Sequence, residues 1–354
     1  MTEQENVLAM YNALAQGEVL PDGAPRGEWL EARNQGIGGS DIGALMGMNP
    51  WRKPLTVLGE KRGEIEPDEA NLLMRAGSHM ESMIRDVCYE QRPEFKPMPK
   101  RLGTVRHKDH PFVLANADEV AYDNHGFTVI EYKNVTSPFA AKHWKDGGFP
   151  IWAWAQLQWY LGIMTSWCED KFQFDHGYLV GCVPSMDKFN LQVRTIMRDD
   201  EWFADAVERA ARAWKLVGSD ANAEDRLFYL DSCDGDPKTF KAVGQLFPGD
   251  RDMEEAEIDS EVDAHCLEME EAVADLKAAQ SRVNDLKSRI GIYMGDAVKG
   301  STGMFRLSWP QNNGRRTFDS KLLAAANPGL DLDEYYKTGK PFRGAIKVTR
   351  VKGA

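Results

Sequence analysis

Two acidic residues, Asp118 and Glu131, occupy mirrored positions in a stretch that has the pattern of a β-hairpin. Residues 112–134 contain two alternating apolar runs, which flank a cluster of turn residues. If the turn is centred on positions 124 and 125, opposed residues have numbers that sum to 249, so Tyr122 faces Phe127 and Asp118 faces Glu131. Directly opposed side chains lie on the same side of a two-stranded ribbon, with Cβ atoms roughly 5 Å apart. The sequence therefore predicts a close pair of carboxylates.

Two facing carboxylates repel each other unless a cation lies between them. Mg²⁺ or Mn²⁺ would suit this position, because hard cations favour carboxylate oxygens. Lys133 is two residues beyond Glu131, so it points to the same face and could hold or deprotonate a water beside the metal. The alternative is an exposed hairpin face with solvated acids. The neighbouring Val129 and Ile130 favour a buried strand instead, and buried acids need partners.

A glycine-rich segment at 36–47 is a candidate phosphate-binding site. Its glycines allow close backbone approach, and Ser40 or Asp41 could cap a helix that starts there, whose N-terminus would attract phosphate. Arg33 is near enough in sequence to supply a charge-assisted second contact. The alternative is a plain glycine loop followed by a helix cap.

Two polar side chains interrupt helical apolar patterns. Glu81 borders an apolar stripe in the helix predicted for 68–91, where it either pairs with Arg85 one turn later or faces a metal. Gln156 belongs to a tryptophan-rich helix predicted for 151–163. Because a buried amide needs hydrogen-bond partners, Gln156 contacts a backbone carbonyl, a metal-bound water or a phosphate.

Composition limits the class of protein. The chain has 354 residues, of which 42% are hydrophobic, and no run of 18 apolar residues. We therefore expect a sizeable core and no membrane span. The N-terminus lacks the pattern of a secretory signal, so we expect a cytoplasmic protein. The five cysteines are scattered without a CxxC pair, which argues against a disulfide framework, a zinc site and an iron–sulfur cluster.

The net charge of −12 argues at first against a nucleic-acid partner. Residues 250–271, however, hold eleven acids and one base, a local net of −10, so about −2 remains for the rest of the chain. Residues 92–108 carry six bases and one acid. A modestly charged domain with a local basic stripe can still bind phosphates.

Patterns along the chain predict four segments. Residues 1–217 form the main domain, and the polar, turn-rich residues 218–250 are expected to be a linker. A near-heptad apolar pattern at 251–297 predicts a long helix in a hairpin or coiled coil. Residues 298–354 are expected to form a small β-containing module.

Together, these motifs resemble the phage λ exonuclease family in its YqaJ-like viral recombinase branch, a part of the PD-(D/E)XK nuclease superfamily. The resemblance covers about residues 27–217 and keeps the order of the family's motifs. It rests on the following segments: Trp29 and Arg33 with Ser40, GGSDIGALMG, RAGSHMES with Glu81, ANADEV with Asp118, IEYKN with Glu131 and Lys133, and AQLQWY with Gln156 and Tyr160.

The resemblance implies an α/β fold with a mixed central sheet flanked by helices. It also implies a Mg²⁺-dependent exonuclease that degrades one strand of linear double-stranded DNA from its 5′ end and leaves 3′ single strands for recombination by annealing. Asp118, Glu131 and the backbone carbonyl of Tyr132 would bind the metal, and Glu81 would complete the acidic cluster. Lys133 would orient the attacking water.

The same resemblance assigns the remaining site residues and partners. Arg33 and Ser40 would hold the terminal 5′-phosphate, and Gln156 would steady the water or the scissile phosphate. Family members form ring-shaped trimers and pass the 3′ strand to a single-strand annealing protein, so both partners are expected here. Three further residues are secondary candidates for the site: Asp41, Gln158 and Tyr160.

Other activities fit parts of the pattern. An enzyme of the same core with a four-cysteine cluster is disfavoured by the scattered cysteines. A structure-selective endonuclease would not need the 5′-phosphate pocket of Arg33 and Ser40. A non-catalytic DNA-binding scaffold would not need Asp118, Glu131 and Lys133 together.

Overall fold

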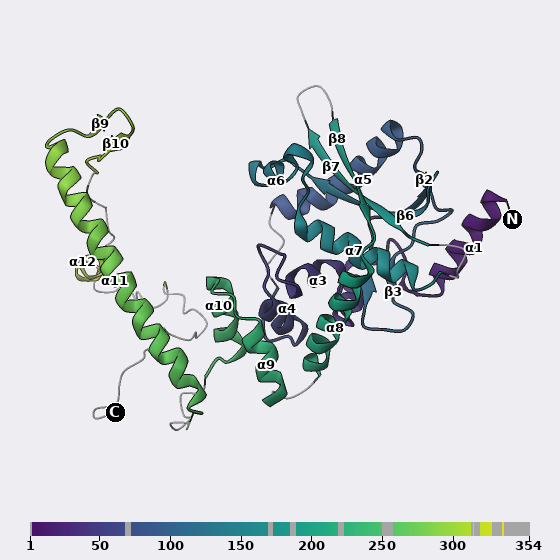
Figure 1. Ribbon diagram of the computed structural model, residues 1–354, viewed down its shortest axis with the longest axis horizontal. Helices are drawn as coiled ribbons and strands as arrows, with labels where there is room; N and C mark the ends of the chain where they lie inside the picture. The colour runs from purple at the N-terminus through teal and green to yellow at the C-terminus, as the bar shows by residue number, and fades with distance from the viewer. Residues whose placement is uncertain are drawn as a thin grey trace. The chain divides into compact units, whose positions relative to one another are not determined.

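The computed structural model describes residues 2–67, 72–168, 173–184, 189–218, 223–249, 258–312, 314, 319–327 and 335. The chain forms two compact units, Met1–Phe247 and Pro248–Ala354. The first contains both sheets of the candidate nuclease domain, and the second contains a long helix and a short hairpin (Figure 1).

A five-stranded mixed sheet forms the centre of the first unit, in the order β2-β5-β6-β7-β8. Only the β6–β7 pair is parallel, and the other neighbours are antiparallel. A second sheet has the order β1-β3-β4. The strands are β1 (Glu18–Leu20), β2 (Lys96–Pro97), β3 (Thr104–Arg106), β4 (Leu114–Ala115), β5 (Glu119–Asp123), β6 (Gly126–Asn134), β7 (His176–Pro184) and β8 (Phe189–Met197).

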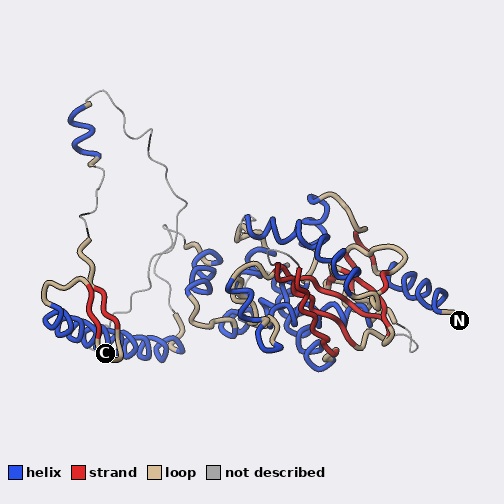
Figure 2. The backbone as a smooth tube through the Cα atoms, turned by 90° about the horizontal axis from the view of Figure 1, so that it is seen from above, coloured by secondary structure: helices blue, strands red, loops and turns tan. Residues whose placement is uncertain are grey.

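Helices surround the central sheet in this unit (Figure 2). This arrangement confirms the predicted α/β class, with a mixed sheet flanked by helices. The helices are α1 (Glu3–Ala15), α2 (Arg26–Asn34), α3 (Gly39–Leu45), α4 (Pro54–Lys61), α5 (Leu72–Gln91), α6 (Pro138–His143), the 3₁₀ helix η1 (Lys145–Gly147), α7 (Ile151–Thr165), α8 (Asp200–Val217), α9 (Ala223–Asp231) and α10 (Pro237–Leu246).

The hairpin of β5 and β6 has the predicted register. Tyr122 pairs with Phe127, and every pair in this ladder sums to 249. The Asp123 side chain fixes the turn, because one of its oxygens accepts hydrogen bonds from the backbone N–H groups of His125 and Gly126. Gly126 has a φ of 133°, which disfavours residues with a side chain. The ladder begins at Glu119, so Asp118 lies immediately before the paired strand.

The two faces of β6 contact different helices. Val129 belongs to the core cluster that includes Leu157 of α7, whereas Ile130 and Tyr132 belong to the cluster that includes Ile84 of α5. Because side chains alternate along a strand, Glu131 points to the same face as Val129. The strand thus carries its acidic residue towards α7 and is buried on both sides.

The predicted linker, 218–250, contains helices. Phe228 of α9 and Ala242 of α10 are buried, and α10 packs on α4. Lys53 binds Asp234 at 2.9 Å and Asp236 at 3.1 Å, which fixes the turn between the two helices. The polar composition concealed these elements, because a short amphipathic helix needs only a few apolar residues on one face.

This packing predicts different stabilities for two truncated chains. A chain that ends at residue 247 is expected to unfold at the same urea concentration as the first unit of the full chain. A chain that ends at residue 217 should lose about 3–5 kcal/mol, the usual cost of removing one large buried aromatic side chain. Urea unfolding followed by tryptophan fluorescence measures the difference. Equal midpoints for the two truncations would contradict the packing of α9 and α10.

The second unit contains α11 (Glu261–Met294), β9 (Lys299–Ser301), β10 (Arg306–Ser308) and α12 (Ser320–Ala326). The helix α11 lies where the near-heptad pattern predicts one, and β9 and β10 form an antiparallel pair within the predicted C-terminal module. Most of that module, including 336–354, lies outside the described residues. None of the helices in the described part of the chain is long and apolar enough to cross a membrane.

Candidate active site

The sheet and α7 bring the predicted catalytic side chains together. The ammonium group of Lys133 donates hydrogen bonds to Oε1 of Glu131 and, at 3.2 Å, to Oε1 of Gln156. Nε2 of Gln156 in turn donates to the Tyr160 hydroxyl at 3.0 Å. The backbone N–H of Tyr132 donates to Oδ2 of Asp118 at 2.8 Å. Asp118, just before β5, and residues of β6 and α7 therefore form one connected polar group.

Burial makes this polar group electrostatically unusual. Loss of solvent, followed by the repulsion of Asp118, raises the pKa of Glu131 to about 8. Burial also raises the pKa of Asp118. Burial opposes the charge of Lys133, but Glu131 and Asp118 more than offset it and raise the pKa of the lysine. The lysine is therefore held as a cation, and the two carboxylates favour any further positive charge.

The site contains one carboxylate oxygen that is available as a metal ligand. Oε2 of Glu131 is buried and has no hydrogen-bond partner among the described residues. An orphaned carboxylate oxygen beside a second carboxylate fits a hard divalent cation, which would take oxygen ligands from Asp118, Glu131 and the carbonyl of Tyr132. Mg²⁺ usually keeps several waters and needs only one or two carboxylates, so this donor set is sufficient.

Glu81 lies on α5 and is the most exposed of the three predicted acids. Partial desolvation, followed by the charge of Asp118, raises its pKa to about 7. Among the described residues, however, no three His, Cys, Asp or Glu side chains form a group that could hold a metal ion. Glu81 thus belongs to the electrostatic surroundings of Asp118 without completing a three-carboxylate cluster in this structure.

The raised pKa values predict how pH and Mg²⁺ affect stability. Between about pH 4.5 and 8, the metal-free folded protein binds more protons at Glu81 and Glu131 than the unfolded chain does, so these groups reduce stability as pH rises. A divalent cation would replace the protons. Thermal melting should therefore show a larger increase in Tm with Mg²⁺ at pH 8 than at pH 6. In Glu131→Gln the increase in Tm with Mg²⁺ should be small at both pH values. An increase in the wild type that is the same at pH 6 and at pH 8 would contradict this prediction.

The predicted phosphate-binding residues form a second charged group around Asp41. This carboxylate is fully buried and contacts three cations: Arg52 at 2.8 Å, Lys61 at 3.0 Å and Arg33 at 3.3 Å. Burial opposes its charge, but the three cations hold the pKa of Asp41 far below its usual value. Because Glu60 is the other acid bound to the group, the cations exceed the anions by one.

Arg33 faces outwards from this group. Its side chain is 34% exposed, compared with 3% for Lys61, and its guanidinium donates to the Ser40 hydroxyl at 2.9 Å. The same guanidinium lies over the ring of Trp29, with 5.4 Å to the centroid. Arg33 and Ser40 therefore lie side by side with polar groups that an anion from solvent could reach.

The helix cap of α3 involves Asp41 and not Ser40. Gly38 is the N-cap of the seven-residue helix α3, and Asp41 accepts a hydrogen bond from the Gly38 N–H at 3.1 Å. Ser40 is therefore inside the helix and free of a capping role. The predicted capping is therefore confirmed for Asp41, which caps the backbone from the third position of the helix, as the residue at this position of a capping box does, and not for Ser40.

Close packing links the two charged groups. A Cβ atom on Gly39 would lie 2.6 Å from the Tyr160 ring, so only glycine fits beside this ring. Tyr160 also accepts the hydrogen bond of Gln156. The first turn of α3, which carries Gly39 and Ser40, is thus connected through Tyr160 to Gln156, the side chain that contacts Lys133.

Residues 28–166 match the family model of the YqaJ-like viral recombinase domain. All the predicted catalytic and phosphate-binding residues fall within this range. Over this range the chain is similar to the YqaJ-like viral recombinase domain. It is also 26% identical over 323 residues to an uncharacterized protein, YqaJ, of Bacillus subtilis (strain 168), with 90% of this chain and 92% of the relative covered.

Solved exonuclease structures are similar at a lower level. The alkaline exonuclease LHK-Exo from Laribacter hongkongensis gives a TM-score of 0.42 at 17% identity, covering 58% of this chain and 95% of that chain. Its complex with dAMP gives 0.44 at 17% identity, covering 58% and 96%. The similarity to the YqaJ-like domain rests on the sequence match and not on this likeness.

Sequence reasoning missed three cations of the candidate site. Arg52 and Lys61 complete the group around Asp41, and Arg101 donates to the Asp118 carbonyl at 3.0 Å. All three belong to basic segments visible in the sequence, but their partner is distant along the chain. The one signal in the sequence was Asp41, an acid within the glycine-rich segment. If such an acid is buried, it needs cations as partners.

Gln158, a secondary candidate for the site, forms hydrogen bonds with the backbone at the end of a neighbouring strand. Its amide donates to the Met197 carbonyl at 2.7 Å and accepts from the Asp199 N–H at 2.8 Å. The amide N–H and the amide oxygen are thus both used by the backbone at the end of β8 and just after it. Gln156 is the glutamine of α7 that contacts Lys133.

Together with the family match, the polar group of Asp118, Glu131 and Lys133 indicates a nuclease that acts on DNA in recombination.

Proposed function

We propose that this protein is a Mg²⁺-dependent exonuclease that degrades the 5′-ended strand of linear double-stranded DNA and leaves 3′ single strands for recombination. The buried group of Asp118, Glu131 and Lys133, with its unused carboxylate oxygen, is the observation that carries the proposal. Mn²⁺ could replace Mg²⁺, because both favour oxygen ligands.

Asp118, Glu131 and the carbonyl of Tyr132 would hold the metal, with Glu81 adding negative charge nearby. When bound, the metal supplies charge stabilisation for the phosphodiester and a lower pKa for bound water. The chain's own residues do the positioning. Asp118 is fixed by the Tyr132 N–H, so its other oxygen has a defined direction.

Lys133 would orient the attacking water as a hydrogen-bond donor. Its raised pKa keeps the ammonium group protonated, which disfavours the other role considered for it, that of a base. Gln156 holds Lys133 and is itself held by Tyr160, so the water and the scissile phosphate would meet donors whose positions are already fixed.

Arg33 and Ser40 would bind the terminal 5′-phosphate. The excess of one positive charge around Asp41 favours an anion, and the guanidinium of Arg33 is already aligned by Asp41 and Ser40. A pocket for a terminal phosphate explains a preference for ends. It favours an exonuclease over a structure-selective endonuclease, and the catalytic group favours both over a non-catalytic scaffold.

The proposed function implies two partners. A single-strand annealing protein would receive the 3′ strand, and a ring-shaped trimer of nuclease domains would retain the DNA between cleavage steps. Both belong to the proposal through the family resemblance.

The proposal is tested with purified protein, Mg²⁺ and two duplexes of the same sequence, one linear and one covalently closed. We expect loss of the linear duplex only, and no loss in EDTA. Cutting of the closed circle would show an endonuclease instead. Stable binding of the linear duplex without cutting, in either Mg²⁺ or Mn²⁺, would support a scaffold.

A further inference from the structure

The helix α11 has an apolar stripe that has no partner among the described residues except at its C-terminal end, where Met294 lies near Gly300. The stripe starts at Val262, ends at Met294 and takes every fourth and third residue in turn. All of these positions are apolar except Gln280 and Lys287. This strict heptad repeat is the pattern of a coiled coil. The helix has 34 residues, which corresponds to a length of about 51 Å.

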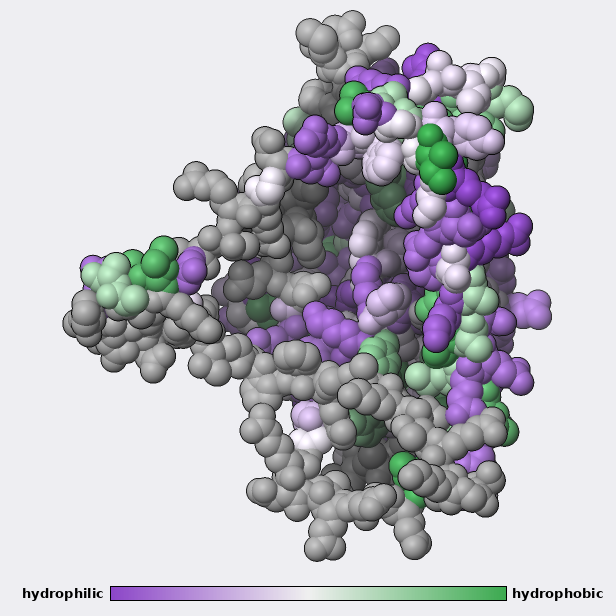
Figure 3. Space-filling view, turned by 90° about the vertical axis from the view of Figure 1, so that its left-hand side faces the viewer, coloured by the Kyte–Doolittle hydropathy of each residue, from purple (hydrophilic) through white to green (hydrophobic). Residues whose placement is uncertain are grey.

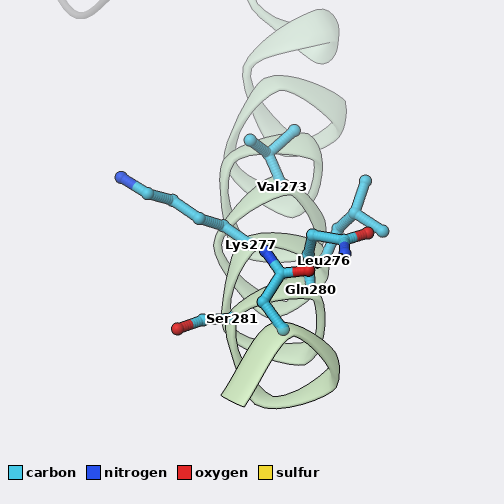
Figure 4. A pocket seen from close by; sticks show the side chains of 6 residues that line it. Val273, Leu276, Lys277, Gln280 and Ser281 are labelled. Carbon is cyan, nitrogen blue, oxygen red and sulfur yellow. Dashed lines mark hydrogen bonds between the residues drawn. The ribbon is translucent and has the colours of Figure 1, made fainter. Parts of the chain in front are cut away.

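The stripe is exposed to solvent. None of the α11 residues is buried, and Leu276 is 70% and Val273 is 54% exposed. Figure 3 shows hydrophobic groups interspersed among hydrophilic ones on the face viewed there. An open recess on α11 is lined by Val273, Leu276 and Gln280 of the stripe and by polar neighbours, all from this one helix (Figure 4). A helix of this length needs a surface that covers the stripe.

The distribution of charge along α11 indicates whether a second copy of this helix would pair with it in parallel or antiparallel. Residues 261–276 contain six acids and no lysine or arginine, whereas 277–294 contain four bases and one acid. Two parallel copies would bring the acidic halves together and would place Lys287 against Lys287. Two antiparallel copies would bring each acidic half against a basic half.

We propose that α11 pairs with the α11 of a second copy of this chain in an antiparallel coiled coil. A register in which facing residues sum to 556 follows from the heptads, since it sets Val262 opposite Met294 and Val273 opposite Val283. Cys266 then faces Ile290 of the second copy. Gln280 packs beside Leu276, and the aliphatic part of Lys287 covers Met269 while its charge reaches solvent.

Cysteine cross-linking tests the direction of pairing in the full-length protein. Cys266 is the cysteine of α11, and Cys233→Ser removes an exposed thiol elsewhere. In this background, Ile290→Cys should form a disulfide-linked dimer under mild oxidation, because facing core positions approach within the range of a disulfide. The chain without Ile290→Cys should not, since two Cys266 residues lie far apart. The matched control Cys266→Ser with Ile290→Cys should also remain uncrosslinked.

Light scattering of the full chain provides an independent test of self-pairing. Leu276→Glu with Val283→Glu should lower the measured mass relative to the wild type by breaking the stripe, without changing the nuclease domain. Dimers through Cys266 alone, or in the Cys266→Ser control, would show parallel pairing and overturn the proposal. An unchanged mass with no cross-link in any variant would also overturn it, and would show that another part of the chain or another protein covers the stripe.

Discussion

Replacement of Lys133 by alanine is expected to lower the rate of DNA hydrolysis by about 10²–10⁴-fold, the usual contribution of one positioned proton donor or acceptor. The loss should appear in kcat more than in KM, because Lys133 contacts Glu131 and Gln156 inside the site. Removing the cation also leaves Asp118 and Glu131 without their internal counter-charge. Single-turnover cleavage of linear duplex at saturating Mg²⁺ measures the effect.

A matched control is available at Lys96. This lysine is exposed on β2 and pairs with Glu3 at 2.7 Å, far in sequence from the candidate site. Lys96→Ala should retain the wild-type rate within about twofold, since exposed ion pairs contribute little. A Lys133→Ala protein that keeps its fold and cleaves at the wild-type rate would show that Lys133 has no part in catalysis.

Replacement of Asp41 by asparagine is expected to reduce the free energy of unfolding by about 3–5 kcal/mol at pH 7, the usual cost of breaking a buried ion group. Arg52, Lys61 and Arg33 would lose their common acceptor. The preference for 5′-phosphorylated ends should fall as well, because the guanidinium of Arg33 would no longer be aligned. Urea unfolding and competition between phosphorylated and hydroxyl-ended duplexes measure the two effects.

The pH dependence of this difference has a defined sign. The pKa of Asp41 is lowered in the folded protein, so its contribution is present above the unfolded pKa of about 4 and is lost as pH falls below that value. The stabilities of wild type and Asp41→Asn should therefore converge in acid. Asp285→Asn is the control, since Asp285 forms an exposed ion pair with Arg289 on α11. A difference between wild type and Asp41→Asn that stays constant down to pH 2 would contradict the role of Asp41.

The central hairpin could be predicted from sequence because its signals are local. Side-chain alternation and a two-residue turn fix the register of β5 and β6, and the register places Asp118 and Glu131 near each other. Lys133 follows by alternation along the same strand. The role of Gln156 was harder to predict. The helix α7 is apolar on nearly every side, so periodicity does not separate Gln156 from Gln158.

The charged group around Asp41 could not be predicted in the same way. Its cations come from α2, from the segment before α4 and from α4 itself, and their meeting depends on how these elements pack. The same limit applies to residues 218–250. Phe228 and Ala242 are too few to produce a clear periodic pattern, yet each is buried against the rest of the unit.

The most direct test of the account follows each strand of a linear duplex that carries a 5′-phosphate on one strand only, with distinct labels on the two 3′ ends. With Mg²⁺, we expect the phosphorylated strand to shorten from its 5′ end while the other strand remains whole, and Lys133→Ala to leave both intact. Shortening of either strand from its 3′ end, or equal loss of both strands, would contradict the proposed polarity and the role of Arg33 and Ser40.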